Sequence, residues 1–207
     1  MNNQQRKDVV LALPPSAPRM PRNWLMEGIG RTILRLGGWR MAGEFPDLPK
    51  FVLIAAPHSS NWDGLWGFAV KLGMGAKLSI LGKDALIKTP LIGKLAKWQG
   101  VIGVDRRAAH GVVEQASMAI RKADRMWFTI APEGTRKLVE RWKPGFWHIA
   151  RTAGVPVVPA YFDYATKTVG IGPPFQLTTN MHADIARIQR WYAPFKGRNH
   201  DVVQPKD

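Results

Sequence analysis

The sequence predicts an α/β fold with a mostly parallel central sheet flanked by helices. Short apolar runs of strand length alternate with longer segments in which apolar residues recur at helical spacing, and turn residues separate the two. The chain has 207 residues, of which 45% are hydrophobic and 22% charged, a mixture that suits a globular domain with a sizeable core. We therefore expect a single domain over residues 23–200.

The elements can be placed in order along the chain. Asn23 can cap a helix that runs to about Leu36, and Gly37-Gly38 can end it. Apolar runs of strand length then predict buried strands, and the segments between them predict helices. The expected strands span residues 51–55, 77–81, 101–104, 126–130 and 156–161, with an edge strand at 167–171, and the expected helices span residues 62–72, 111–122, 146–152 and 181–191.

Residues 1–22 are polar, basic and rich in proline, which predicts a disordered basic arm. The apolar run from Val9 to Leu13 is too short for a signal peptide, because Pro14 and Pro15 interrupt it at once. No stretch reaches the roughly 18 apolar residues that a membrane-spanning helix needs. Any contact with a membrane is therefore expected to be peripheral.

The formal net charge of +15 predicts an anionic partner: nucleic acid, a phosphate-bearing substrate or an anionic membrane. Nine Trp residues favour the membrane, because indole suits the membrane–water interface, although a place in the core explains a given Trp equally well. The helix expected over residues 23–36 is amphipathic, and it either lies in a membrane interface or packs on its own domain. The absence of Cys excludes disulfides, thiolate nucleophiles and Cys-ligated zinc.

His58 and Asp63 form the first candidate site. His58 lies in the turn that leaves a predicted strand, and Asp63 lies in the first turn of the next predicted helix. A carboxylate in that position can accept a hydrogen bond from one imidazole nitrogen and leave the other free as a base. The spacing alone is also compatible with a plain helix N-terminal carboxylate.

A second candidate, Pro132–Arg136, directly follows a predicted strand. Its Gly lets backbone N–H groups approach an anion, and Arg136 can bind phosphate through two hydrogen bonds. Glu133 could orient an arginine or accept a hydrogen bond from a substrate hydroxyl. An ordinary surface turn would have a similar composition.

Asp105 and Arg106 follow another predicted strand. In that position Arg106 can bind a phosphate while Asp105 holds an arginine side chain in place. Alternatively, the two residues form a solvated ion pair. Sites in parallel sheets gather at the carboxyl ends of the strands. His58, Asp105 and Glu133 are therefore expected to converge on one crevice.

Several classes of enzyme lack their motifs here. Ser59 and Ser60 follow His58, but the Gly-x-Ser-x-Gly elbow of serine hydrolases is absent, which leaves an acyl-serine intermediate as a minor alternative. No phosphate-binding loop or dinucleotide fingerprint is present. The remaining His residues are scattered, so no metal site is expected: His110, His148, His182 and His200.

In this order, the segments resemble the glycerophospholipid acyltransferase family, which includes the 1-acyl-glycerol-3-phosphate acyltransferases. The resemblance covers about residues 37 to 175, and the chain is similar to a compact branch with a short N-terminus. Ala131 stands where the third motif usually has Phe. The four motifs are His58 to Asp63; Gly82, Lys83, Pro90 and Gly93 with Gly100 to Arg106; Pro132 to Arg136 with Lys143 and Gly145; and Val155 to Pro159.

The resemblance implies a role for each motif. His58 would be the general base that deprotonates the acceptor hydroxyl, and Asp63 would orient it. The residues implied to bind the glycerol phosphate are Lys83, Arg106, Glu133, Gly134, Thr135 and Arg136, and those implied on the acyl-chain side are Pro156, Val157, Val158 and Pro159. An alcohol that attacks a thioester needs a base and a stabilised oxyanion, and no metal or cofactor is implied.

The implied function is transfer of a fatty acyl group from acyl-CoA or acyl carrier protein to a lysophosphatidic acid-type acceptor in phospholipid biosynthesis. Another lysolipid or an aminolipid is the alternative acceptor. The expected location is the cytoplasmic face of an anionic membrane, with no nucleic acid partner. A basic binding protein for nucleic acid or membrane is the non-catalytic alternative, which charge alone would support.

Overall fold

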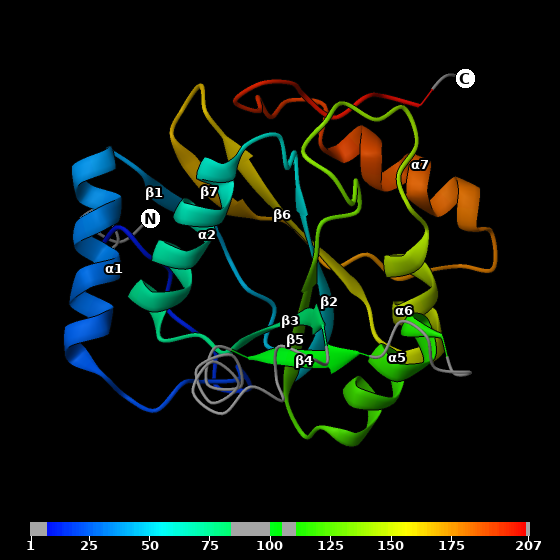
Figure 1. The fold of residues 1–207 in the computed structure, drawn as a ribbon, viewed down its shortest axis with the longest axis horizontal. Helices are drawn as coiled ribbons and strands as arrows, with labels where there is room; N and C mark the ends of the chain where they lie inside the picture. The colour runs from blue at the N-terminus through cyan, green and yellow to red at the C-terminus, as the bar shows by residue number, and fades with distance from the viewer. Residues whose placement is uncertain (1–7, 84–99, 105–110, 206–207) are drawn as a thin grey trace.

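The computed structural model describes residues 8–83, 100–104 and 111–205. Helices and strands alternate along most of this length (Figure 1). The helices are α1 (Trp24–Gly37), α2 (Asn61–Met74), α5 (Val112–Lys122), α6 (Gly145–Ala153) and α7 (Met181–Trp191). The strands are β1 (Arg40–Gly43), β2 (Lys50–Ala56), β3 (Leu78–Lys83), β4 (Val101–Val104), β5 (Met126–Ile130), β6 (Val157–Asp163) and β7 (Thr168–Ile171).

The described strands form one sheet in the order β1-β7-β6-β2-β5-β3-β4. Every neighbouring pair is parallel except β6 and β7, which are antiparallel. The prediction of a mostly parallel sheet is therefore confirmed. The expectation of an edge strand at 167–171 is wrong, because β1, which the sequence did not predict, pairs with the outer side of β7.

Alternating side chains of β2 enter two different cores. Phe51 and Leu53 pack on the face that α1 and α2 cover, whereas Val52 and Ile54 pack on the face that α5, α6 and α7 cover. Successive side chains of a strand point to opposite faces, so a continuous apolar run is what a central strand buried on both faces requires. Figure 1 shows the resulting three layers, with α1 and α2 on one side of the sheet and the later helices on the other.

Helix α1 begins and ends where the sequence predicts. The Asn23 side chain accepts a hydrogen bond from the Met26 N–H, and Gly38 ends the helix with φ 71°. The helix packs closely on α2, since a Cβ on Gly30 would lie 2.4 Å from the backbone nitrogen of Gly73. Glycine therefore allows the two helix backbones to approach one another here.

Residues 8–22 differ from the disordered arm that the sequence led us to expect. Val10 and Ala17 are buried in the core on the α1–α2 side of the sheet. Backbone hydrogen bonds tie the segment down at both ends, from Met41 to the Val9 carbonyl and from Met20 to the Gly75 carbonyl. The apolar run from Val9 to Leu13 therefore contributes to the fold. Within the described residues, no helix has the length and apolar character to cross a membrane.

Candidate active site

The candidate site lies at the carboxyl ends of β2 and β5. The two strands are parallel neighbours, with Ile54 paired to Ile130, so the segments that follow them leave the same edge of the sheet. His58 follows β2 and Glu133 follows β5, and the structure brings them into direct contact. Convergence of these two motifs, predicted from their positions after strands, is confirmed.

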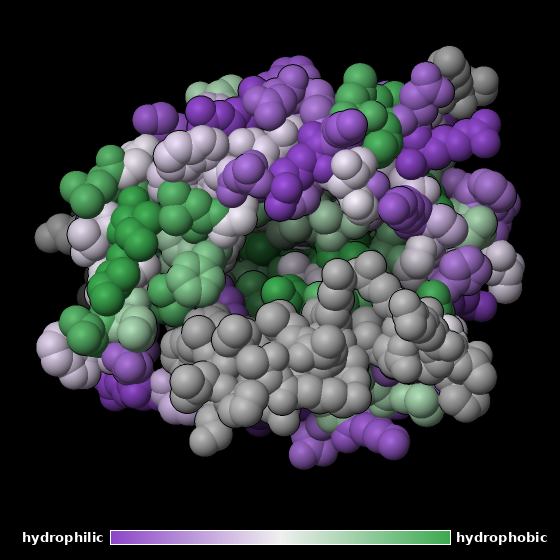
Figure 2. Space-filling view, in the orientation of Figure 1, coloured by the Kyte–Doolittle hydropathy of each residue, from purple (hydrophilic) through white to green (hydrophobic). Residues whose placement is uncertain are grey.

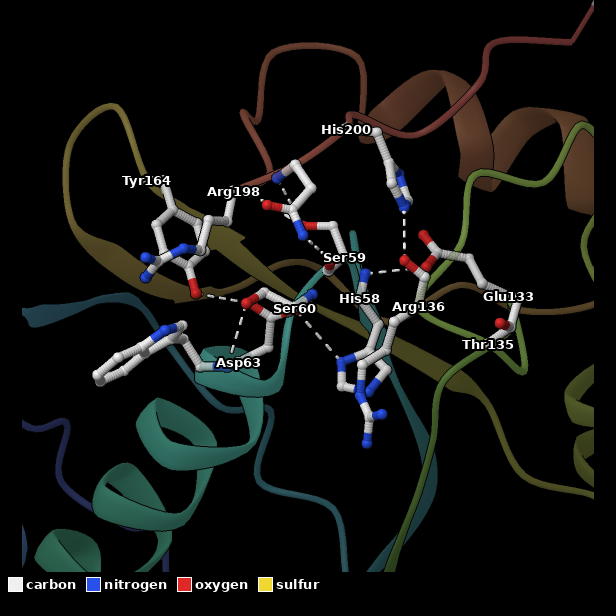
Figure 3. A network of polar contacts seen from close by, with 12 residues as sticks. His58, Ser59, Ser60, Asp63, Glu133, Thr135, Arg136, Tyr164, Arg198 and His200 are labelled. Carbon is white, nitrogen blue, oxygen red and sulfur yellow. Dashed lines mark hydrogen bonds and ion pairs between the residues drawn. The ribbon is translucent and has the colours of Figure 1, made fainter.

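The His58 ring faces the Asp63 carboxylate, with Nδ1 3.4 Å from Oδ2 (Figure 3). Asp63 is buried, at 1% exposure, whereas a quarter of the His58 side chain is exposed. A carboxylate at Nδ1 favours the tautomer with its proton on that nitrogen, which leaves Nε2 as the basic atom. The pair thus has the arrangement of a general base and its orienting carboxylate.

Helix α2 explains why Asp63 lies where it does. Ser60 caps the helix, its hydroxyl accepts a hydrogen bond from the Trp62 N–H, and the Ser60 N–H donates to Asp63 Oδ2 at 2.8 Å. This reciprocal capping fixes the carboxylate at the positive end of the helix dipole. The carboxylate that caps α2 is also the one that faces His58, so the two roles considered from the sequence do not exclude one another.

Glu133 holds the backbone of His58. It is buried, at 2% exposure, and its Oε2 accepts a hydrogen bond from the His58 N–H at 3.0 Å. Burial raises the pKa of Glu133, and the hydrogen bond from His58 opposes that rise. In this position Glu133 fixes the turn that carries His58. The sequence had suggested instead that Glu133 orients an arginine or accepts a hydrogen bond from a substrate hydroxyl.

The loop that follows Glu133 turns at Gly134, where φ is 65° and a Cβ would lie 2.7 Å from Cδ of Lys143. The Thr135 hydroxyl accepts a hydrogen bond from the Lys137 N–H. Arg136 is exposed, and Figure 3 shows its side chain extending from the loop toward His58. Arg136 is therefore placed to bind an anion beside the base.

The other predicted site residues have different outcomes. Arg106 and the side chain of Lys83 lie outside the described part of the chain. Residues 156–159 do not reach the His58 edge, because they lie at the start of β6, opposite the middle of β2. Val157 and Val158 have no exposed surface and pack in the two cores, so their placement favours a structural role over direct contact with an acyl chain.

The family model described as Acyltransferase matches residues 45–163, which is more than half of the chain. The chain belongs to the acyltransferase family. The crystal structure of the 1-acyl-sn-glycerophosphate (LPA) acyltransferase PlsC from Thermotoga maritima is similar in fold, with a TM-score of 0.56 and 18% sequence identity over 84% of this chain and 80% of that one. A search of curated proteins found no match. The family resemblance drawn from the motifs is thus confirmed, and so is the fold.

Two parts of the acyltransferase site lie beyond the matched residues. The Tyr164 hydroxyl donates a hydrogen bond to Asp63 Oδ1 at 2.6 Å. The C-terminal segment, residues 196–201, covers the turn after His58, where the Ser59 hydroxyl accepts hydrogen bonds from the N–H groups of Arg198 and Asn199. Sequence reasoning missed both, because a lone Tyr and a polar terminus carry no motif.

The C-terminal segment also contacts the loop after β5. The Asn199 side chain donates to the Ser59 carbonyl at 2.6 Å, and His200 Nε2 lies 3.1 Å from the Arg136 carbonyl oxygen. A single short segment therefore joins the turn of the first motif to the loop of the third.

Proposed function

We propose that the protein transfers a fatty acyl group from a thioester, acyl-CoA or acyl carrier protein, to the hydroxyl of a lysophosphatidic acid-type acceptor. The observation that carries this proposal is the pairing of His58 Nδ1 with a buried carboxylate while part of the ring stays exposed. The resemblance of the motifs supports this acceptor, and the PlsC whose fold the chain shares is described as an LPA acyltransferase.

The chemistry requires one proton to move twice. His58 Nε2 takes the proton of the acceptor hydroxyl as its oxygen attacks the thioester carbonyl carbon. The tetrahedral oxyanion collapses with cleavage of the C–S bond, and the imidazolium returns the proton to the departing thiolate. Asp63 stabilises the imidazolium between the two transfers, and Glu133 keeps the His58 backbone in place.

The phosphate of the acceptor would be bound beside the base. Arg136 is an exposed cation whose side chain extends toward His58, and a guanidinium binds phosphate oxygens through two parallel hydrogen bonds. Lys83 and Arg106 remain predicted phosphate ligands. The strands β3 and β4 are parallel neighbours, with Lys83 paired to Val104, so their carboxyl ends lie at the same edge of the sheet.

The proposed location is peripheral, on the cytoplasmic face of an anionic membrane. Apolar side chains stay exposed on α2, which carries Asp63, and on α1, which packs on α2; Trp24 and Leu36 of α1 are 79% and 85% exposed. Figure 2 shows them gathered over α1 and α2. We name this set the apolar patch: Trp24, Leu25, Ile29 and Leu36 of α1, and Trp62, Leu65 and Phe68 of α2. An amphipathic surface of this kind on a protein of charge +15 fits an anionic lipid interface.

The test of the reaction is transfer of labelled acyl groups from acyl-CoA and from acyl carrier protein to lysophosphatidic acid and to other lysolipids. His58→Ala is expected to abolish product formation while the circular dichroism spectrum is retained. His148→Ala, a change of the same kind at an exposed position on α6, is the matched control and should keep full activity. Activity that survives His58→Ala would remove the base from the proposal, and product only with another lysolipid would change the acceptor.

Membrane contact is tested separately by flotation with anionic and neutral vesicles. Replacing Trp24 and Leu36 by Gln is expected to weaken binding to anionic vesicles, because it removes two exposed apolar side chains from the apolar patch. Leu138→Gln, which changes an exposed leucine of the loop after β5, is the control. Equal flotation of wild type and the double variant would contradict this location.

A further inference from the structure

The Asp63 carboxylate has more partners than the catalytic pairing needs. Its Oδ2 faces His58 Nδ1 and accepts a hydrogen bond from the Ser60 N–H. Its other oxygen, Oδ1, accepts a hydrogen bond from the Tyr164 hydroxyl at 2.6 Å. A short hydrogen bond from a hydroxyl to a buried carboxylate is among the stronger ones in proteins, because the acceptor is charged and shielded from water.

Tyr164 is itself held in place on several sides. Its backbone N–H donates to the Lys196 carbonyl at 2.8 Å. Its ring meets Trp39 edge-on at 4.9 Å between centroids, and the Arg198 guanidinium lies 5.9 Å from its centroid on another side. The tyrosine is therefore a fixed support for the carboxylate, and its side chain has little freedom to turn away.

The Tyr164 hydroxyl keeps its proton wherever His58 can act as a base. Burial raises the pKa of Tyr164, and the hydrogen bond to Asp63 raises it further. A hydroxyl that stays protonated can only serve Asp63 as a donor. It therefore stabilises the carboxylate throughout the working pH range and does not take part in proton transfer itself.

We infer that Tyr164 is a positioning residue of the acyl-transfer site, which holds Asp63 so that Oδ2 faces His58 and thereby keeps the His58 ring oriented as the base. The role rests on the proposed function, and it is exerted through Asp63 without contact with substrate. Tyr164 follows directly on the residues that match the family, which end at residue 163. It is brought to the site by the turn between β6 and β7.

The direction of the expected effect follows from the charges around the pair. Among the described residues, the charges of His200, His58 and Asp63 act on Glu133, and those of Asp63 and Arg198 act on Tyr164. Tyr164→Phe removes the dipole that offsets part of the Asp63 charge and leaves the other contacts in place. The carboxylate then presents more of its charge to the His58 ring, and we expect the acid limb of the rate profile to move to higher pH.

The chain has three Tyr residues, which supply both the test and its controls. Tyr161→Phe removes a hydroxyl from β6, three residues before Tyr164. Within the described residues, the Tyr161 hydroxyl makes no hydrogen bond to His58 or Asp63. Tyr192→Phe removes a fully buried hydroxyl that donates to the carbonyls of Ile54 and Ala160, so it reports the effect of general loosening. The first measurement is an NMR titration of the histidine rings, with the His58 signal assigned by its loss in His58→Ala.

In Tyr164→Phe we expect the pH dependence of the His58 ring signals to differ from that of wild type, because the charge presented by Asp63 to Nδ1 changes. We expect kcat for labelled acyl transfer to fall by about tenfold, because a carboxylate released from Tyr164 orients the His58 ring less well. We expect KM to stay within about twofold, because the proposed role of Tyr164 involves no contact with substrate. Tyr161→Phe should match wild type in both measurements. An unchanged His58 midpoint and kcat in Tyr164→Phe, or an equal change in Tyr161→Phe or Tyr192→Phe, would overturn the inference. If wild type transfers no acyl group, the proposed function fails, while the NMR titration still decides whether Tyr164 acts on His58.

Discussion

The substitution Asp63→Asn tests the catalytic pair most directly, because it removes one charge and keeps the shape of the side chain. The distance from His58 Nδ1 to Asp63 Oδ2 is 3.4 Å, so the attraction of an imidazolium to the carboxylate amounts to about 5 kcal/mol at an effective dielectric constant of about 20. Each 1.4 kcal/mol or so corresponds to a factor of ten in rate. If most of this attraction acts in the transition state, kcat/KM should fall by about a thousandfold.

The amide also has to fit the donors around it. Asp63 accepts hydrogen bonds on both oxygens, from the Ser60 N–H and from the Tyr164 hydroxyl, and an asparagine has a single acceptor oxygen. The Tyr164 hydroxyl can rotate and accept from the amide, whereas the Ser60 N–H cannot. The amide oxygen should therefore stay beside Ser60 and His58, so that the variant folds with the pair in place but uncharged.

The assay compares kcat/KM for labelled acyl transfer in wild type and Asp63→Asn across pH 6 to 9, with thermal unfolding measured in parallel. Asp47→Asn is the control, since Asp47 accepts a hydrogen bond from the Ser16 N–H far from the site. A folded Asp63→Asn protein that keeps more than about a tenth of the wild-type kcat/KM would refute the argument. It would mean that the charge of Asp63 contributes little to the transition state.

Three further predictions follow from other contacts. Burial raises the pKa of Glu133 above its value in the unfolded chain, so ionised Glu133 lowers the stability of the fold at pH values above that pKa. The melting temperature of Glu133→Gln should therefore be higher than that of wild type at pH 7.5 and close to it at pH 4. A difference in melting temperature that does not depend on pH would contradict this. Asn199→Ala should lower kcat severalfold with little change in melting temperature, since it frees the Ser59 carbonyl beside His58, and an unchanged kcat would remove the C-terminal segment from the site. Gly30→Val should lower the melting temperature by several degrees in thermal unfolding, because its side chain would collide with the backbone of α2, and an unchanged melting temperature would show that the helices can separate freely.

Local signals predicted the local parts of the structure. Helix α1 starts directly after Asn23 and ends at Gly37, as expected, because capping depends on neighbouring residues. The contact between His58 and Asp63 was also predictable, since a strand, a turn and a helix start bring residues five apart together. Strand β1 was missed because its four residues form no apolar run, and its pairing with β7 depends on backbone groups far away in the sequence.

The contacts that sequence could not supply are those between distant segments. Tyr164 is 101 residues from Asp63, and Asn199 is 140 residues from Ser59. Neither belongs to a motif, and each reaches the site because a turn or the chain terminus folds over it. The role of Glu133 was missed for the same reason. Its partner is the backbone N–H of His58, and a pattern of side chains in the sequence does not predict such a contact.

Helix α2 connects the chemistry to the proposed membrane contact. Its first turn carries the Asp63 carboxylate, which is buried, while Trp62, Leu65 and Phe68 of the same helix remain exposed. One turn of an α-helix rises about 5.4 Å, so an interface that accepts Trp62 and Leu65 would lie within about one turn of the catalytic pair. The reactive hydroxyl of a lysolipid lies close to its polar headgroup, and the thioester of an acyl donor lies where the acyl chain joins its polar carrier. A base held at the start of a helix whose outer face is apolar would therefore meet these groups at the membrane surface, without extraction of the whole lipid into the protein.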